Sequence, residues 1–344
     1  MGRPLACRSA AGVHRRSTAR AALLGLAVLL GAGVAPVGAG ASSMPLPAPP
    51  VQPEPCPPPP LPPGPPAPPL RPPLVATSRV PLVASPPARR VDLAAITGKG
   101  IWLTLWPGSH PDLAAIVARA RAAGIDQLWV RTGSTADGYY GGKVLAALVP
   151  LAHAAGVHVV AWDFPTLSDP RADAHRAEQA LASGADAFSA DIETAAEGTY
   201  LGVRRVRYYL SLVRRYAGPR PVVATVLPPG PYWSRAYPYA AMAPFVDAFA
   251  PMVYWSCAEP GAAVAQAVVP LRRLRPVVPI GQDFNMASIG GRHGLPSPAE
   301  IWRFLYVAHS LGAIGASLYD LESGGPAQFA ALADYPWALH PARS

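Results

Sequence analysis

The chain has little cysteine and none of the common hydrolase motifs. It contains three cysteines in 344 residues, and no C-x-x-C, H-E-x-x-H or His-x-His motif supplies the spacing of zinc ligands. No G-x-S-x-G element of the kind that presents a nucleophilic serine occurs either. These absences argue against zinc hydrolases and serine esterases, and we expect no metal and no cofactor. Whether Cys56 and Cys257 pair with each other or remain separate thiols is open from the sequence.

Acidic residues are also few, but the resulting positive charge is unevenly placed. The chain carries 29 Lys and Arg against 20 Asp and Glu, a formal net charge of +9. Five of these charges fall in residues 1–41 and three in residues 42–90, which leaves +1 for residues 91–344. A domain that binds nucleic acid gathers basic residues on its folded part. We therefore expect no nucleic-acid partner.

Residues 1–41 have the pattern of a secretory signal peptide. Arg15 and Arg16 precede an apolar run over residues 21–34, and residues 39–41 offer small side chains for cleavage. The run is short and rich in Gly and Ala, which makes it a poor membrane span, and an uncleaved anchor is the alternative. We expect a secreted or cell-envelope protein that touches the membrane only through this segment, if the segment stays uncleaved.

Residues 42–90 differ from the rest of the chain in composition. They hold 21 of the 45 prolines, including the run Cys56-Pro-Pro-Pro-Pro60. Such a stretch favours extended polyproline II and lacks the apolar surface that a packed core requires. We expect a disordered Pro-rich linker, with a ligand for a proline-binding module as the alternative.

From residue 91 onward, strand-like and helix-like patterns alternate. Apolar strand-like runs lie at 101–106, 127–132, 158–164, 187–193, 221–227, 248–255, 277–283 and 316–320. Helix-like stretches separate them, among them 111–123, 142–155, 171–182, 200–216 and 298–311, and several end in glycine as helix C-caps do. Eight strand-then-helix units in about 250 residues predict an α/β fold, a (β/α)8 TIM barrel over residues 91–344. A doubly wound open sheet is the alternative, but no Gly-rich phosphate loop follows the first strand. We expect a monomer.

Acids and aromatic residues follow the predicted strands, at the end where a TIM barrel has its active site. In chain order they are Trp106, Arg131, Trp162, Asp163, Asp191, Glu193, Tyr254, Trp255, Gln282, Asp283, Tyr319 and Glu322. Carboxylates perform glycosidic bond chemistry, and flat rings stack on the faces of sugars. The predicted rim is therefore typical of a carbohydrate site.

Asp191 and Glu193 are the central pair of this rim. A strand alternates its side chains between two faces, so the two carboxylates share one face, about 7 Å apart at ~3.3 Å rise per residue. Because like charges repel, we expect one pKa to rise while the other stays low, which is the division that acid/base catalysis uses. A solvated or Arg-paired strand end is the alternative interpretation.

The other rim residues also have structural interpretations. These are loop packing for Trp106, Trp162 and Trp255, burial against Arg131 for Asp163 and Asp283, and a core position for Tyr254. A divalent cation held by Asp163, Asp191 and Glu193 is conceivable, because hard cations take carboxylate oxygens, but we rank it below acid/base catalysis.

Two segments resemble a known family. Asp186-Ala-Phe-Ser-Ala-Asp-Ile-Glu193 resembles the DxxDxDxE motif of family 18 glycoside hydrolases, the chitinase-like barrels, with Ser189 in place of the middle Asp. Pro251-Met-Val-Tyr-Trp255 is similar to the Met-x-Tyr motif on strand six of that family. The family's Ser-x-Gly-Gly on strand three is absent, and Tyr319 stands where the family usually has Trp. The Asp-x-Glu is also similar to that of family 25 lysozymes, whose first-strand Asp is missing here.

The resemblance implies roles for the matched residues. Glu193 would protonate the glycosidic oxygen, and Asp191 would position the substrate's N-acetyl group or stabilise positive charge in the transition state. Tyr254 would form a hydrogen bond near the anomeric centre. A substrate without an N-acetyl group needs a separate nucleophile, for which Asp283 is the first candidate and Glu322 the second.

The sequence therefore favours a secreted glycoside hydrolase-like protein that cleaves cell-wall or extracellular polysaccharide. A catalytically inactive barrel that binds glycans at the cell envelope is the alternative, because a fold alone does not fix a function. Ser189, which stands in place of the middle Asp of the motif, favours this alternative. A metal-dependent phosphodiester or amide hydrolase would need three or more converging acids.

Overall fold

A computed structural model describes residues 80–87, 89–230 and 233–337 of the protein. The predicted signal peptide and most of the predicted linker lie outside these residues. The described end of the linker contacts the folded domain, since Arg207 Nη2 donates a hydrogen bond to the carbonyl of Val83 at 3.0 Å. Within the described ranges, no helix has the length and apolar character needed to cross a membrane.

The strands form a closed barrel. Nine strands make one sheet in the described part of the chain, and all of them except β3 are parallel. The barrel strands are β1 (Gly98–Leu103), β2 (Gln127–Ser134), β4 (His158–Phe164), β5 (Ala187–Asp191), β6 (Val222–Val226), β7 (Ala248–Val253), β8 (Ile280–Gln282) and β9 (Gly315–Tyr319). Because β1 pairs with both β2 and β9, the sheet has no open edge there. The predicted TIM barrel is confirmed, and the open sheet is excluded.

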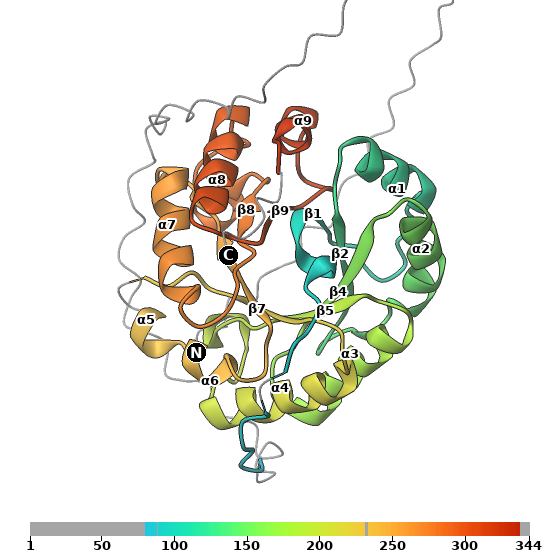
Figure 1. Ribbon diagram of the computed structural model, residues 1–344, viewed down its shortest axis with the longest axis vertical. Helices are drawn as coiled ribbons and strands as arrows, with labels where there is room; N and C mark the ends of the chain where they lie inside the picture. The colour runs from blue at the N-terminus through green and yellow to red at the C-terminus, as the bar shows by residue number, and fades with distance from the viewer. Residues whose placement is uncertain (1–79, 88, 231–232, 338–344) are drawn as a thin grey trace, which may run out of the picture. The chain divides into compact units, whose positions relative to one another are not determined.

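Helices surround the ring of strands (Figure 1). They are α1 (Leu113–Ala122), α2 (Gly142–Ala154), α3 (Pro170–Ala182), α4 (Val203–Ala217), α5 (Trp233–Ala236), α6 (Tyr239–Met242), α7 (Pro260–Leu271), α8 (Pro298–Ser310) and α9 (Pro326–Asp334). Short 3-10 helices lie at η2 (Ala94–Ile96), η3 (Ala195–Glu197) and η4 (Met286–Ile289). The glycines that follow α1, α2, α3 and α8 all have positive φ, between 60° and 99°, as the predicted caps require. A short hairpin strand, β3 (Gly138–Tyr139), pairs antiparallel with the end of β2.

Strand alternation divides the apolar residues into two cores. On β1, Ile101 and Leu103 belong to the large core beneath the helices, whereas Trp102 belongs to the smaller core inside the barrel. Ile96 of η2 is fully buried in the same inner core, so the short helix that precedes β1 packs into the barrel interior. Side chains on the inner face of each strand therefore lie either in this core or, beyond it, at the carboxyl-terminal rim.

Large aromatic rings fill the barrel beneath that rim. Trp102 stacks on Trp129, with ring centroids 4.9 Å apart, and Trp162 lies 5.3 Å from Trp102 in a tilted arrangement. The indole nitrogen of Trp102 donates to Ser317 Oγ at 2.9 Å. Gly100 leaves room for this layer, because a Cβ at its position would lie 2.7 Å from Trp129 Nε1. The rings form the floor of the space enclosed by the strand ends.

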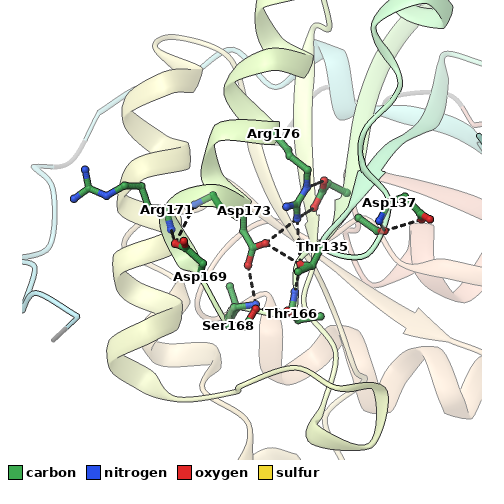
Figure 2. A network of polar contacts seen from close by, with 12 residues as sticks. Thr135, Asp137, Thr166, Ser168, Asp169, Arg171, Asp173 and Arg176 are labelled. Carbon is green, nitrogen blue, oxygen red and sulfur yellow. Dashed lines mark hydrogen bonds and ion pairs between the residues drawn. The ribbon is translucent and has the colours of Figure 1, made fainter. Parts of the chain in front are cut away.

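A buried ion-pair network fixes the loop after β2 against α3 (Figure 2). Arg176 donates from Nε to Asp163 Oδ2 at 2.6 Å, and from Nη2 to Asp163 Oδ1 and Asp173 Oδ1, both at 2.9 Å. Thr135 donates from its hydroxyl to Asp173 Oδ1 at 2.8 Å. Asp163 is therefore a buried acid in an ion pair, as the structural alternative held, but its partner is Arg176 of α3 and not Arg131.

Removal of Arg176 should destabilise the domain strongly, because Asp163 and Asp173 would stay buried without their countercharge. We expect Arg176→Met to lower the free energy of unfolding by about 3–5 kcal/mol, measured by urea unfolding followed by circular dichroism. Arg171→Met is the matched control, since Arg171 lies on the exposed side of the same helix and should change stability by less than about 0.5 kcal/mol. Superimposable unfolding curves for Arg176→Met and the wild type would contradict this account.

Candidate active site

Inward-facing side chains at the carboxyl ends of the strands form the candidate site. Of the predicted residues, those on this face are Arg131, Trp162, Asp191, Glu193, Tyr254, Gln282 and Tyr319. Ring contacts connect three of these residues. The ring centroid of Tyr319 lies 6.4 Å from that of Trp162 and 6.1 Å from that of Tyr254. The rim thus gathers residues from β2, β4, β5, β7, β8 and β9.

The end of β5 carries both carboxylates. Ser189 faces inward, with its hydroxyl 2.8 Å from Thr225 Oγ1, so alternation places Asp191 and Glu193 on the same face. Ile192, between them, is fully buried in the outer core. The Ile192 carbonyl accepts a hydrogen bond from the Tyr237 hydroxyl, and its amide donates to the Thr225 carbonyl at 3.0 Å. The backbone that carries Glu193 is therefore anchored on both sides.

Burial raises the pKa of both carboxyl groups. Asp191 Oδ1 is buried without a hydrogen-bond partner, and its pKa lies well above the ordinary value because of burial and, second, the charge of Glu193. Arg131 acts in the opposite direction. Burial, with a further contribution from Glu197, raises the pKa of Glu193 to about 7. The expectation that one pKa stays low is wrong, since both groups lose solvent at the same strand end.

Aromatic residues surround the carboxylates. Tyr254 packs edge-on against Phe284, with centroids 5.1 Å apart. The pKa of the Tyr254 hydroxyl is raised well above its usual value, first by burial and then by neighbours that include Asp191 and Glu193. This hydroxyl stays protonated at neutral pH and is a hydrogen-bond donor close to the acids. The indole Nε1 of Trp162 is buried without a hydrogen-bond partner among the described residues.

Arg131 connects the floor of the site to its rim. Its guanidinium carbon lies 4.2 Å from the ring centroid of Trp106 and 5.5 Å from that of Trp162. Trp106 is 56% exposed, which is unusual for tryptophan, and the stacked cation holds its ring in place. Arg131 Nη2 is also 3.8 Å from Asp137 Oδ2. Trp106 is therefore a supported aromatic platform at the edge of the site.

Asp283 lies against the loop after β9. The residue before it, Gln282, faces inward, so Asp283 falls on the outer side of β8. A Cβ on Gly324 would lie 2.1 Å from Asp283 Oδ2, which places the carboxylate directly against the loop after β9. Burial and the charge of Asp320 raise the pKa of Asp283 to about 8. The structure does not give this carboxylate the position across the cleft that a separate nucleophile requires.

The remaining predicted residues organise loops. Trp255 faces α8, where its ring centroid is 5.4 Å from that of Phe304 and its Nε1 donates to Glu300 Oε1 at 3.3 Å. Gln282 accepts the Ser256 amide at 2.9 Å through Oε1 and so connects the loops after β7 and β8. Glu322 is exposed in the loop after β9. Cys257 forms a disulfide, and its partner lies outside the described residues.

Two further placements bear on the chemistry. Asp186 precedes β5 and accepts the Val159 amide at 2.8 Å, so the first acid of the family 18-like motif lies at the opposite end of the strand from Glu193. Asp163 turns toward α3, away from Asp191 and Glu193. Among residues 80–87, 89–230 and 233–337, no group of three or more His, Cys, Asp or Glu is arranged to hold a metal ion.

Sequence reasoning missed several residues that shape the site. They are the floor residues Trp102 and Trp129, and the neighbours Thr104, Glu197, Tyr237 and Phe284. Thr104 illustrates their role, since its hydroxyl donates to Asp320 Oδ2 at 2.8 Å and lies 3.1 Å from the Tyr319 hydroxyl. Alternation along each strand would have found the two tryptophans. Trp129 lies two residues before Arg131, and Trp102 lies an even number of residues before Trp106, so each shares a strand face with a predicted rim residue.

The comparisons with known proteins show a shared fold. No family model matches the chain, and no curated protein matches it. The spore cortex-lytic enzyme SleL of Bacillus cereus is a structural neighbour with a TM-score of 0.54 and 12% identity, covering 69% of this chain and 73% of that one. A chitinase from Chromobacterium violaceum has a TM-score of 0.54 and 12% identity, covering 69% and 98%. A GH113 β-1,4-mannanase has a TM-score of 0.50 and 10% identity, covering 65% and 87%. The chain therefore has the TIM-barrel fold that these glycoside hydrolases share.

The charge of Glu197 should be measurable at Glu193. Because a nearby negative charge disfavours ionisation, Glu197→Gln should move the pKa of Glu193 below its value of about 7, while the Gln oxygen can still accept the Thr194 amide. NMR titration of the side-chain carboxyl carbons checks this. Glu178→Gln, on the exposed side of α3, is the control and should leave Glu193 unchanged. A Glu193 that titrates near 4.5 in the wild type would refute the arrangement.

Proposed function

We propose that this chain is a secreted glycoside hydrolase that cleaves cell-wall or extracellular polysaccharide containing N-acetylated sugars. The observation that carries the proposal is the pair of inward carboxyl groups on β5, of which Glu193 has a pKa raised to about 7 by burial. A general acid with a pKa near the working pH is best suited to donate and recover a proton. The fold shared with chitinase and mannanase structures supports the proposal by analogy.

Glu193 is the proton donor in this mechanism. Its carboxylic acid gives a proton to the glycosidic oxygen as the bond from that oxygen to the anomeric carbon breaks. In the second half of the reaction, the Glu193 carboxylate takes a proton from the attacking water and returns to its starting state. Its position at the open end of β5, beside Asp191, places both steps in the same small space.

The nucleophile is best supplied by the substrate. Asp163 and Asp283, the other buried acids of the predicted rim, face outward, so neither opposes Glu193. The carbonyl oxygen of a neighbouring N-acetyl group would form the bond to the anomeric carbon, with its N–H donating to Asp191. The unpartnered Asp191 Oδ1 offers the acceptor, and positive charge on the cyclised group favours its ionised form. Tyr254 would donate its hydroxyl to the acetamido carbonyl, while Trp162 contacts the sugar ring.

A binding protein without catalysis is the second candidate. Ser189 occupies the place of a carboxylate in the family 18 motif, and its hydroxyl is already paired with Thr225 at 2.8 Å. No third inward acid on β5 therefore tunes Asp191. An inactive barrel would retain the aromatic residues for glycan binding and would not require Glu193 to donate a proton.

Replacement of Glu193 separates these two functions. With the full chain and a panel of wall polysaccharides and N-acetylated oligosaccharides, we expect Glu193→Gln to reduce the release of reducing ends by about 10²–10⁴-fold. Glu178→Gln should retain wild-type activity, and unfolding curves should show that both variants are folded. No release by the wild type on any substrate, with unchanged glycan binding in Glu193→Gln, would instead favour the binding protein.

The Tyr254 hydroxyl should act mainly on the chemical step. Tyr254→Phe keeps the ring against Phe284 but removes the donor, so we expect kcat to fall by about 10²-fold with a much smaller change in KM. Steady-state kinetics on the substrate found above measures both constants. Tyr306→Phe, on α8, is the control. An increase in KM at constant kcat would assign Tyr254 to substrate binding alone.

A further inference from the structure

A hollow of about 470 Å³ opens beside the candidate active site, between the loop after β1 and the start of α2. Trp106 lines it and also contacts Arg131, so the hollow and the active site share one aromatic wall. Small-ligand sites have volumes of roughly 300–1,000 Å³, which makes this hollow large enough for a sugar unit. The proposed mechanism uses none of its lining residues.

The walls combine apolar surface with positive charge. Leu105 and Pro111 provide part of the apolar lining, and the exposed ring of Trp106 offers a face for stacking. Lys143 lines the same hollow from the first turn of α2, where the free backbone amides of the helix also favour an anion. Among the described residues that line the hollow, there is no Asp or Glu.

The Tyr140 hydroxyl supports a hydrogen-bonding ligand in this hollow. The Tyr140 hydroxyl is buried without a hydrogen-bond partner at the wall of the hollow. Burial is the main reason that its pKa rises to about 12, so it remains a donor at neutral pH. Asp137 and Asp163 also act on Tyr140 through their charges. Asp137 already accepts the Ser134 hydroxyl at 2.7 Å and lies 3.8 Å from Arg131, and Asp163 is paired with Arg176. Lys143 therefore faces the hollow without a competing carboxylate in its lining.

We infer that the hollow is an accessory subsite for a carboxylate-bearing sugar unit of the polysaccharide, with Lys143 binding the carboxylate and Trp106 the ring. The inference rests on the proposed function, because it names the class of glycan that reaches the neighbouring active site. Two kinds of sugar carry this chemistry. In uronic acids the carboxylate is part of the sugar, and in muramic acid it lies on an ether-linked lactyl arm.

Binding without turnover tests the subsite. We would measure Kd by calorimetry for the full chain carrying Glu193→Gln, with polygalacturonate oligomers and with muramic acid-containing glycan strands. Each is compared with the same glycan after methyl esterification of its carboxylates. We expect the carboxylated form of at least one to bind about fivefold more tightly or better, as a charge-assisted contact at an exposed site predicts. The glycan that shows the preference identifies the source of the carboxylate.

Variants of Lys143 assign that preference to the hollow. Lys143→Gln should abolish it and Lys143→Arg should retain it, while Arg121→Gln, an equal change of charge on the exposed side of α1, should leave it intact. Equal affinity for carboxylated and esterified glycans, or a preference that survives Lys143→Gln, would overturn the inference. A carboxylate preference without release of reducing ends by the wild type would refute the hydrolase and keep the subsite. Release of reducing ends without a preference for carboxylated glycans would keep the hydrolase and refute the subsite.

Discussion

Closure of the sheet between β1 and β9 determines where the other side chains of the barrel lie. Once β1 pairs with β2 on one side and β9 on the other, every strand has an inner and an outer face, and each residue must belong to one of them. Trp102 and Trp129 then fill the interior, while the neighbours of each in sequence pack beneath the helices. The same rule continues past the last hydrogen bond of β5, where it turns Asp191 and Glu193 inward and Ile192 outward.

The loss of solvent around Asp191 and Glu193 at the end of β5 costs stability, because it disfavours the charged form of each carboxyl group. Among the residues that the structure describes, neither acid has a close ion pair like the one between Arg176 and Asp163. In that pair, two charge-assisted hydrogen bonds of 2.6 Å and 2.9 Å satisfy the carboxylate. Arg131 instead stacks on tryptophan rings and acts on Asp191 only through its charge. A carboxylate oxygen that is buried without a partner among the described residues, as Asp191 Oδ1 is, is typical of sites where a ligand completes the contacts.

The sequence was sufficient for the barrel, the order of its strands and the inward position of the β5 carboxylates, because apolar period, capping glycines and alternation are local properties. It was not sufficient to separate the faces at a strand end. Trp162 and Asp163 are adjacent, yet one lies over the barrel floor and the other pairs with α3. Gln282 and Asp283 divide in the same way. A list of all polar residues after a strand includes residues from both faces of that strand. The partner that turns one of them outward, as Arg176 does for Asp163, comes from a helix whose packing cannot be read from the sequence.

The placement of the acids also restricts the chemistry. A retaining mechanism with an enzyme nucleophile needs a carboxylate about 5–5.5 Å from the proton donor, on the other side of the scissile bond. Here Asp163 and Asp283 have turned into the helix layer and the loop after β9, and Asp191 reaches the site from the same strand as Glu193. Two acids on one strand approach a sugar from one side. That arrangement fits a reaction in which one acid moves the proton and the other steadies a group of the substrate that itself attacks the anomeric carbon. The outward turn of Asp163 and Asp283 thus connects the fold of β4 and β8 to the proposed N-acetylated substrate.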